Sequence, residues 1–157
     1  MVDANEAWGA KEASVRIAAM QDTGCKLLWV EDLRHDFEGL RALRQATPRT
    51  LINSGEYLDV AGKRQLLTAG ATDILNDHGQ VTDVMHIGWL AAELGIPVSP
   101  GNTFLEVGVH MACALPEVQW LEYSFQNFDH LVEVPIEIRD GWAYAPDKPG
   151  HGLALAR

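Results

Sequence analysis

The feature that most limits the folds open to this sequence is the alternation of short apolar runs with longer amphipathic stretches. The short runs have the composition of buried strands, and the stretches between them carry apolar residues at helical spacing. The apolar runs are 1–3, 27–30, 50–53, 73–75, 96–99 and 118–121, and the helical stretches include 37–44, 60–67, 81–94 and 104–114. Gly24, Gly70 and Gly95 each follow a helical pattern, where a residue with positive φ commonly ends a helix. This alternation predicts a parallel sheet, in either a doubly wound α/β fold or a barrel.

The last part of the chain has a different pattern. Residues 136–138 and 142–144 alternate at period two around Asp140-Gly141, which predicts a β-hairpin. No low-complexity linker divides the sequence, so we expect one domain. It covers 1–157, with alternating units over 1–122 and the hairpin and a loop-rich tail over 123–157.

The charge balance narrows the range of partners. The 157 residues include 12 Lys and Arg against 22 Asp and Glu, a formal net charge of −10. Nucleic acids and anionic membranes would repel such a protein, so neither is an expected partner. No apolar run is long enough to span a bilayer and no basic-then-apolar leader is present, which indicates a cytoplasmic protein. Two cysteines are too few for a disulfide framework or a thiolate zinc site.

Acidic residues stand where the apolar runs end. Asp3, Glu31, Glu56 and Glu122 each follow one of these runs. In parallel α/β proteins the carboxyl ends of the strands meet on one face, and that face carries the site. Carboxylates gathered there repel one another unless a cation lies among them, and oxygen ligands suit Mg²⁺. The alternative is that these acids are helix caps or solvated loop residues.

Several ordered motifs resemble the mandelate racemase branch of the enolase superfamily. They are Val2-Asp3-Ala4-Asn5, Trp29-Val30-Glu31-Asp32, Ser54-Gly55-Glu56 and Trp120-Leu121-Glu122, together with the segments 35–39 and 146–152. The resemblance runs from end to end of the chain. It implies the C-terminal part of a (β/α)8-type, TIM-like α/β barrel, about strands three to eight, followed by a C-terminal β-hairpin. The capping domain and the first two barrel strands of the family have no counterpart in these residues.

The resemblance also implies a site. Asp3, Glu31 and Glu56 match the three ligands of a Mg²⁺ ion at the ends of barrel strands three, four and five. Asn5 falls where some members contact substrate, and Glu122 matches the strand-eight carboxylate that hydrogen-bonds the developing enolate. The family reaction abstracts a proton α to a carboxylate. Because that proton is very weakly acidic, charge stabilisation at the enolate must supply most of the catalysis.

The sequence departs from the family at its bases. The strand-two lysine base lies outside the matching part, and the usual strand-seven histidine is replaced within Ser99-Pro100-Gly101-Asn102-Thr103. Neither glycine nor asparagine accepts a proton at neutral pH, although Asn102 is placed to contact substrate. Asp77 is the candidate for the aspartate that orients the family histidine, in a loop shorter than the family loop. His78 is either a displaced base or a loop histidine without a catalytic role.

These observations leave several functions open. The first is dehydration of an acid sugar, a small carboxylate substrate; the nearest alternative is racemisation or epimerisation, which normally requires two opposed bases. A different class is a non-catalytic metal-binding or structural barrel fragment, whose open sheet edges favour a homo-oligomer or association with the missing N-terminal portion. An unrelated acidic-pocket domain of the response-regulator kind would need a lysine at a strand end, and the sequence offers none there.

Overall fold

The computed structural model describes residues 1–101, 105–124 and 128–157. Its centre is one sheet of five parallel strands that follow one another in chain order. The strands are β1 (Val2–Asp3), β2 (Trp29–Glu31), β3 (Leu51–Ser54), β4 (Ile74–Asn76) and β5 (Val98–Ser99). A parallel sheet with this sequential order is the arrangement of a β/α barrel. The predicted fold class is therefore confirmed for the described part of the chain.

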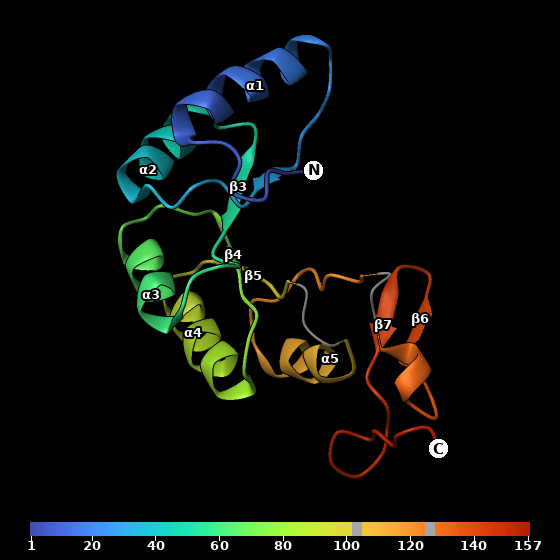
Figure 1. Ribbon diagram of the computed structural model, residues 1–157. Helices are drawn as coiled ribbons and strands as arrows, with labels where there is room; N and C mark the ends of the chain where they lie inside the picture. The colour runs from blue at the N-terminus through green and yellow to red at the C-terminus, as the bar shows by residue number, and fades with distance from the viewer. Residues whose placement is uncertain (102–104, 125–127) are drawn as a thin grey trace.

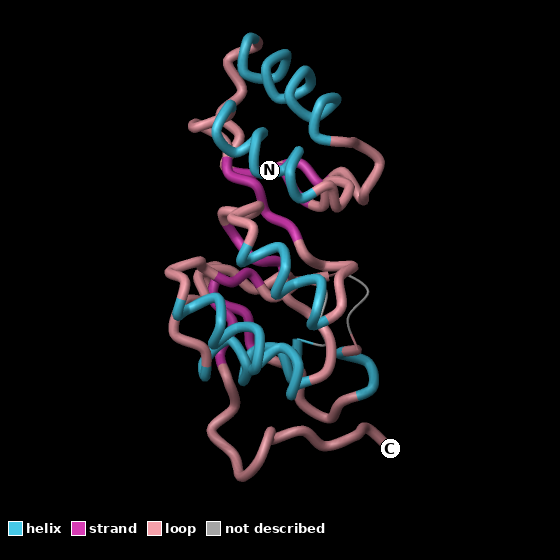
Figure 2. Tube along the Cα trace, turned by 90° about the vertical axis from the view of Figure 1, so that its left-hand side faces the viewer, coloured by secondary structure: helices cyan, strands magenta, loops and turns pink. Residues whose placement is uncertain are grey.

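A helix connects each strand to the next. The helices are α1 (Ala10–Asp22), α2 (Phe37–Ala46), α3 (Val60–Thr68), α4 (Val81–Glu93) and, after β5, α5 (Leu105–Ala114). Helices α1 to α4 lie along one side of the row of strands (Figure 1). Viewed from that side, the helices lie in front of the strands (Figure 2). None of the described helices has both the length and the apolar character needed to cross a membrane.

Local signals explain where several helices begin and end. The side chains of Asp36 and Asp59 accept hydrogen bonds from the third backbone N–H that follows each of them, at the N-termini of α2 and α3. Gly24, Gly70 and Gly95 have φ values of 84°, 63° and 68° just beyond α1, α3 and α4. The predicted glycine helix ends are thus confirmed.

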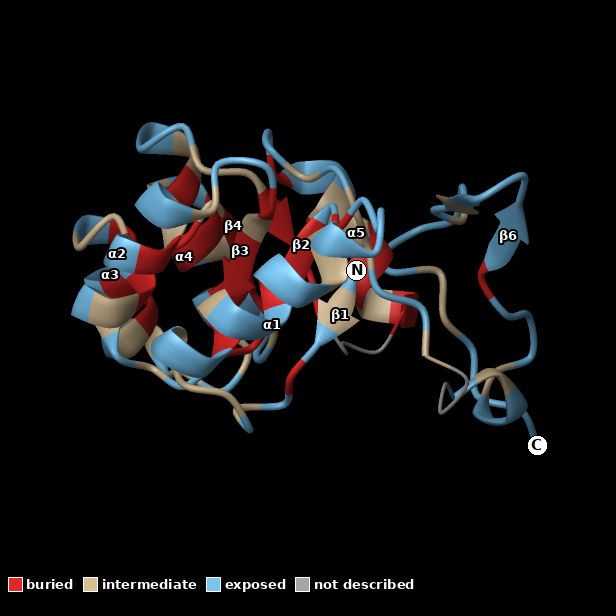
Figure 3. Ribbon diagram, turned by 90° about the horizontal axis from the view of Figure 1, so that it is seen from above, coloured by how far each residue is buried: buried red, intermediate tan, exposed pale blue. Residues whose placement is uncertain are grey.

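The two faces of the sheet differ in polarity. Strand register and the period-two alternation of side chains place Val30, Ile52 and Leu75 on one face, where they join the helices in the main core. Buried residues gather in these strands and on the facing helix surfaces (Figure 3). The opposite face carries Glu31 and Asn53 side by side. The chain therefore builds its core between sheet and helices, and leaves polar groups on the inner side of the curved sheet.

The expected strand at 118–121 is only partly formed. A single parallel bridge joins Val118 to Val98, and the Glu122 N–H donates to the Pro100 carbonyl oxygen at 3.0 Å. This segment continues the parallel order beside β5 without the repeated ladder of a full strand. It still carries Glu122 to the end of the sheet at which β5 ends.

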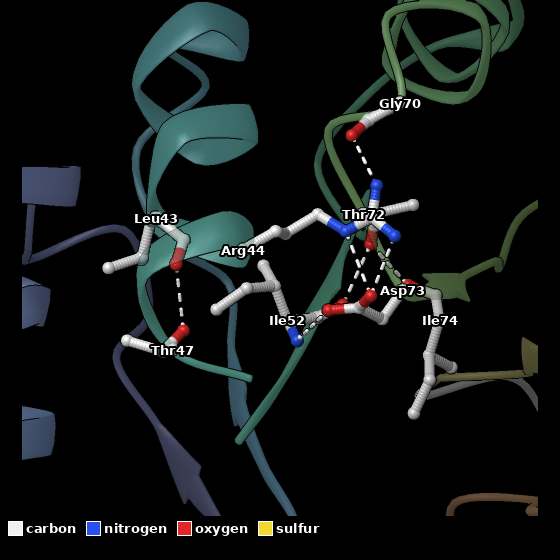
Figure 4. A network of polar contacts seen from close by, with 8 residues as sticks. All are labelled: Leu43, Arg44, Thr47, Ile52, Gly70, Thr72, Asp73 and Ile74. Atoms are coloured by element: carbon white, nitrogen blue, oxygen red, sulfur yellow. Dashed lines mark hydrogen bonds and ion pairs between the residues drawn. The ribbon is translucent and has the colours of Figure 1, made fainter. Parts of the chain in front are cut away.

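Polar contacts fasten α2 to the end of the sheet opposite the acidic residues. The Arg44 guanidinium donates to Asp73 Oδ1 at 2.7 and 2.9 Å and to the Gly70 carbonyl oxygen (Figure 4). Asp73 Oδ2 accepts from the Ile52 N–H at 2.9 Å, while the Thr72 hydroxyl donates to the Ile52 carbonyl oxygen. Gly70, Thr72 and Asp73 precede β4, and Ile52 lies near the start of β3. The network therefore stabilises the sheet and lies away from the carboxyl ends of the strands.

The predicted hairpin is formed by β6 (Glu137–Arg139) and β7 (Trp142–Tyr144), which pair antiparallel. Asp140 and Gly141 have φ values of 53° and 81°, as a two-residue hairpin turn of type I′ requires. The hairpin stands beyond α5 (Figure 1), and Ile136 joins a small core with two residues of that helix.

Candidate metal and substrate site

The predicted carboxylates lie at the carboxyl ends of neighbouring strands. Asp3 and Glu31 are the last residues of β1 and β2 and are paired in register. Glu56 follows β3 by two residues, and Glu122 is bound to the segment that follows β5. Burial raises the pKa of Glu31, and the charges of Asp3, Glu122 and Glu56 act in the same direction. The strand register and the backbone hydrogen bond of Glu122 place the four acids at one edge of the sheet.

Within the described ranges, no three His, Cys, Asp or Glu side chains lie close enough together to hold one metal ion. The carboxylate of Glu31 is instead held by hydrogen-bond donors of the protein. Glu31 Oε2 accepts from Trp29 Nε1 at 2.6 Å and from Asn53 Nδ2 at 3.2 Å. Its other oxygen, Oε1, accepts from Asn76 Nδ2 at 3.0 Å. Glu31 is therefore oriented toward donors on β2, β3 and β4.

Asn5 links the acid at the end of β1 to the loop after β3. Its N–H and Nδ2 donate to the two Asp3 carboxylate oxygens at 2.8 and 3.0 Å. Its Oδ1 accepts from the Tyr57 hydroxyl at 3.0 Å. Asn5 has a φ of 43°, a conformation that asparagine adopts more readily than most residues. The residue expected to contact substrate thus also orients Asp3.

Asp32 is an acidic site residue that sequence reasoning did not single out. It is fully buried, and neither carboxylate oxygen accepts a hydrogen bond from the described residues. Burial and the neighbouring carboxyl group of Glu56 raise the pKa of Asp32 to about 9. The available signal was the second acid directly after Glu31 in the sequence.

The structure gives Asp77 a partner that the sequence analysis did not foresee. Lys63 of α3 donates to Asp77 Oδ1 at 2.7 Å and to the His78 carbonyl oxygen at 2.8 Å. Burial raises the pKa of Asp77 to about 6, although the Lys63 ammonium acts in the opposite direction. Lys63 follows Val60 by three residues, which puts it on the buried side of α3, and a lysine in that position requires a polar partner.

His78 lies in the loop after β4, beside a cavity lined mainly by residues at the starts of α3 and α4; Asp3, Glu31 and Glu122 do not line it. Together with Glu56, Lys63 and Asp77, His78 lines this cavity, which has a volume of about 860 Å³. Burial and the Lys63 charge lower the pKa of His78, and the charges of Glu56 and Glu122 oppose this shift. A neutral imidazole can accept a proton, so the location allows His78 to act as a base. The predicted substrate contact Asn102 lies outside the described residues.

A family comparison agrees with this arrangement of strands. The family model described as enolase C-terminal domain-like matches residues 1–157. The chain belongs to this enolase C-terminal domain-like family. The resemblance to mandelate racemase-like members of the enolase superfamily is thereby confirmed.

Solved structures of this family match the whole chain closely. A crystal structure from Mesorhizobium loti, named provisionally as a mandelate racemase, is 73% identical with a TM-score of 0.94, over 99% of this chain and 43% of that one. L-Talarate dehydratase from Polaromonas sp. JS666, complexed with Mg and L-glucarate, is 34% identical with a TM-score of 0.87, over 99% of this chain and 44% of that one. The enolase-like barrel portion is therefore a shared fold.

A curated relative shows the variety of reactions in the family. Chloromuconate cycloisomerase from Cupriavidus pinatubonensis is 26% identical over 167 aligned residues, which cover 98% of this chain and 45% of the relative. The enolase-family chain spans less than half the length of the relatives and structures that it matches.

Proposed function

We propose that this chain carries the metal-binding part of the active site of a Mg²⁺-dependent acid-sugar dehydratase. The observation that carries the proposal is the register pairing of Asp3 with Glu31, with Glu56 two residues beyond the end of the neighbouring strand β3. The similarity to a dehydratase structure complexed with Mg and L-glucarate supports the same substrate class. The reaction begins with transfer of the proton α to the substrate carboxylate to a base, and it ends when the β-hydroxyl group takes up a proton and leaves as water.

The donors present fit a hard divalent cation. Asp3, Glu31 and Glu56 would hold it after their side chains turn toward one point, because no three acidic side chains of the described residues lie close enough to share one ion. Mg²⁺ prefers oxygen ligands and keeps several waters. Each carboxylate oxygen has more than one lone pair, so Asp3 and Glu31 can keep their N–H partners while they bind a metal. Asp32 beside Glu56 has a pKa of about 9, so it is protonated at neutral pH without a metal, and a bound cation would favour its ionised form. When bound, the cation stabilises the negative charge of the enolate.

His78 is the proposed proton acceptor. Its lowered pKa keeps the imidazole neutral near pH 7, and it lines the same cavity as Glu56. Asp77, bound to Lys63, fixes the loop in which His78 lies. Glu122 is proposed to hydrogen-bond the enolate oxygen, because its backbone is anchored beside the end of β5.

Racemisation is the second candidate, favoured by the relative named provisionally as a mandelate racemase. That reaction needs an acid–base group on each face of the substrate carbon. The candidate base among the described residues is His78, and position 101, in the segment where the family histidine is replaced, is glycine. Dehydration can proceed with one base, so it remains the preferred proposal.

Two measurements test the proposal. Thermal unfolding of the purified chain with Mg²⁺ or with EDTA tests the metal site, because a ligand that binds the folded form raises Tm. We expect a rise with Mg²⁺ that Asp3→Ala and Glu56→Ala abolish. Incubation with acid sugars in D₂O, followed by NMR, then detects loss of the α-proton and of the β-hydroxyl group. Exchange without elimination would favour racemisation, and metal binding with neither reaction would indicate that catalysis requires further polypeptide. No response of Tm to Mg²⁺ would refute the metal site.

A further inference from the structure

Asn76 reaches from the end of β4 to the acid at the end of β2. Its side chain is 1% exposed, and Nδ2 donates to Glu31 Oε1 at 3.0 Å. Among the described residues this amide is the hydrogen-bond partner that holds Oε1, since Trp29 and Asn53 both donate to Oε2. The orientation of the Glu31 carboxylate therefore depends on Asn76.

Gly101 faces the same amide from the segment after β5. A Cβ atom at this position would lie 2.1 Å from Asn76 Oδ1, 3.0 Å from Cγ and 3.2 Å from Nδ2. The φ of Gly101 is not in the positive range that favours glycine, so the requirement for glycine is one of space. The Asn76 amide occupies the volume that any side chain at position 101 would need.

The Asn76 side chain cannot rotate away from a new side chain at position 101 without disturbing its hydrogen bond to Glu31. Asn76 Oδ1 is buried and accepts no hydrogen bond from the described residues. No hydrogen bond would therefore keep Oδ1 in place if a side chain at position 101 pushed against it. A rotation that removes Oδ1 from a new Cβ also moves Nδ2, because both atoms belong to one planar group. The hydrogen bond to Glu31 Oε1 would then be lost or lengthened.

We propose that Asn76 and Gly101 form a coupled pair that positions Glu31 for metal binding. The inference rests on the proposed function, in which Glu31 is a metal ligand. Asn76 is a positioning residue. The lack of a side chain at Gly101 leaves the space that the Asn76 amide needs to reach Glu31. A side chain at 101 would act on the metal site through Asn76, so position 101 carries no acid–base group while Asn76 holds the ligand.

A double-mutant cycle tests this coupling. The variants are Gly101→Ala, Asn76→Ala and the double variant, with Gly9→Ala as a control because a Cβ at Gly9 meets nothing within 4 Å. Isothermal titration measures the Mg²⁺ dissociation constant of each purified chain. We expect each single variant to weaken Mg²⁺ binding by about 10-fold or more, as is usual when a partner of a metal ligand is lost. The double variant should be no weaker than Asn76→Ala, and Gly9→Ala should match the wild type.

The outcomes separate this inference from the proposed function. Additive losses in the double variant, or unchanged binding in Gly101→Ala, would overturn the coupling and leave the metal site intact. If the wild type binds no Mg²⁺, the proposed function fails, and urea unfolding without metal still tests the pair. The clash exists without metal, so Gly101→Ala should destabilise the wild-type chain much more than it destabilises Asn76→Ala. Equal destabilisation in both backgrounds would overturn the inference.

Discussion

The Lys63 ammonium lies 2.7 Å from Asp77 Oδ1, and the two side chains are only 5% and 1% exposed. Lys63 also donates to the carbonyl oxygen of His78. One buried cation on α3 therefore fixes both the side chain and the backbone of the loop that follows β4. This loop borders the acidic edge of the sheet, so the stability of the pair and the geometry of the candidate site are linked.

Removal of the ammonium should be strongly destabilising. Lys63→Met leaves the Asp77 carboxylate buried without its partner, and we expect a loss of about 3 kcal/mol in the free energy of unfolding at pH 7. The double variant Lys63→Met/Asp77→Leu removes both charges and should recover much of that loss. Urea unfolding checks both values. A single variant as stable as the wild type would show that the pair contributes little.

Asp77 also predicts a pH dependence. Burial raises its pKa from 3.8 to about 6, so the folded chain binds this proton more tightly than the unfolded chain. The contribution of Asp77 to stability is therefore most favourable below pH 4 and falls as the pH rises to about 6. The difference in unfolding free energy between the wild type and Asp77→Asn, measured across this range, should follow that slope. A flat difference would contradict the shift.

The local features of the fold were predictable from sequence. Gly70 ends α3 and Asp140-Gly141 forms the hairpin turn because such residues act through their own backbone conformation. The positions of Asp3 and Glu31 at strand ends were also predictable, since a parallel sheet aligns the residues that come directly after each short apolar run.

Contacts between distant segments were not predictable. The pairing of Lys63 with Asp77 depends on how α3 packs against the next loop, which no periodicity encodes. The Asn76 amide meets Glu31 across 45 sequence positions, and its space requirement at Gly101 exists only in the folded chain. The assignment of roles to the site residues and the single-domain boundary remain predictions.

Tyr57 should affect the metal site through Asn5. Its hydroxyl donates to Asn5 Oδ1, and Asn5 in turn holds both carboxylate oxygens of Asp3. Tyr57→Phe should weaken Mg²⁺ binding by about 10-fold or less and leave the unfolding free energy nearly unchanged, because the side chain is 53% exposed. Calorimetric titration checks the affinity. Tyr144→Phe, on the hairpin, is the matched control and should bind Mg²⁺ like the wild type.

His78 is the remaining test of the chemistry. If it is the proton acceptor, His78→Gln should slow exchange of the substrate α-proton with D₂O by about 100-fold or more, since a positioned general base contributes at least that much. The Mg²⁺ dissociation constant should stay unchanged, because His78 is not among the proposed ligands. His86→Gln replaces an exposed histidine of α4 that contacts Arg64, and it should exchange the proton at the wild-type rate. Equal exchange rates in all three proteins would exclude His78 as the base. Slower exchange in both variants would indicate an effect on the loop and helix instead of on proton transfer.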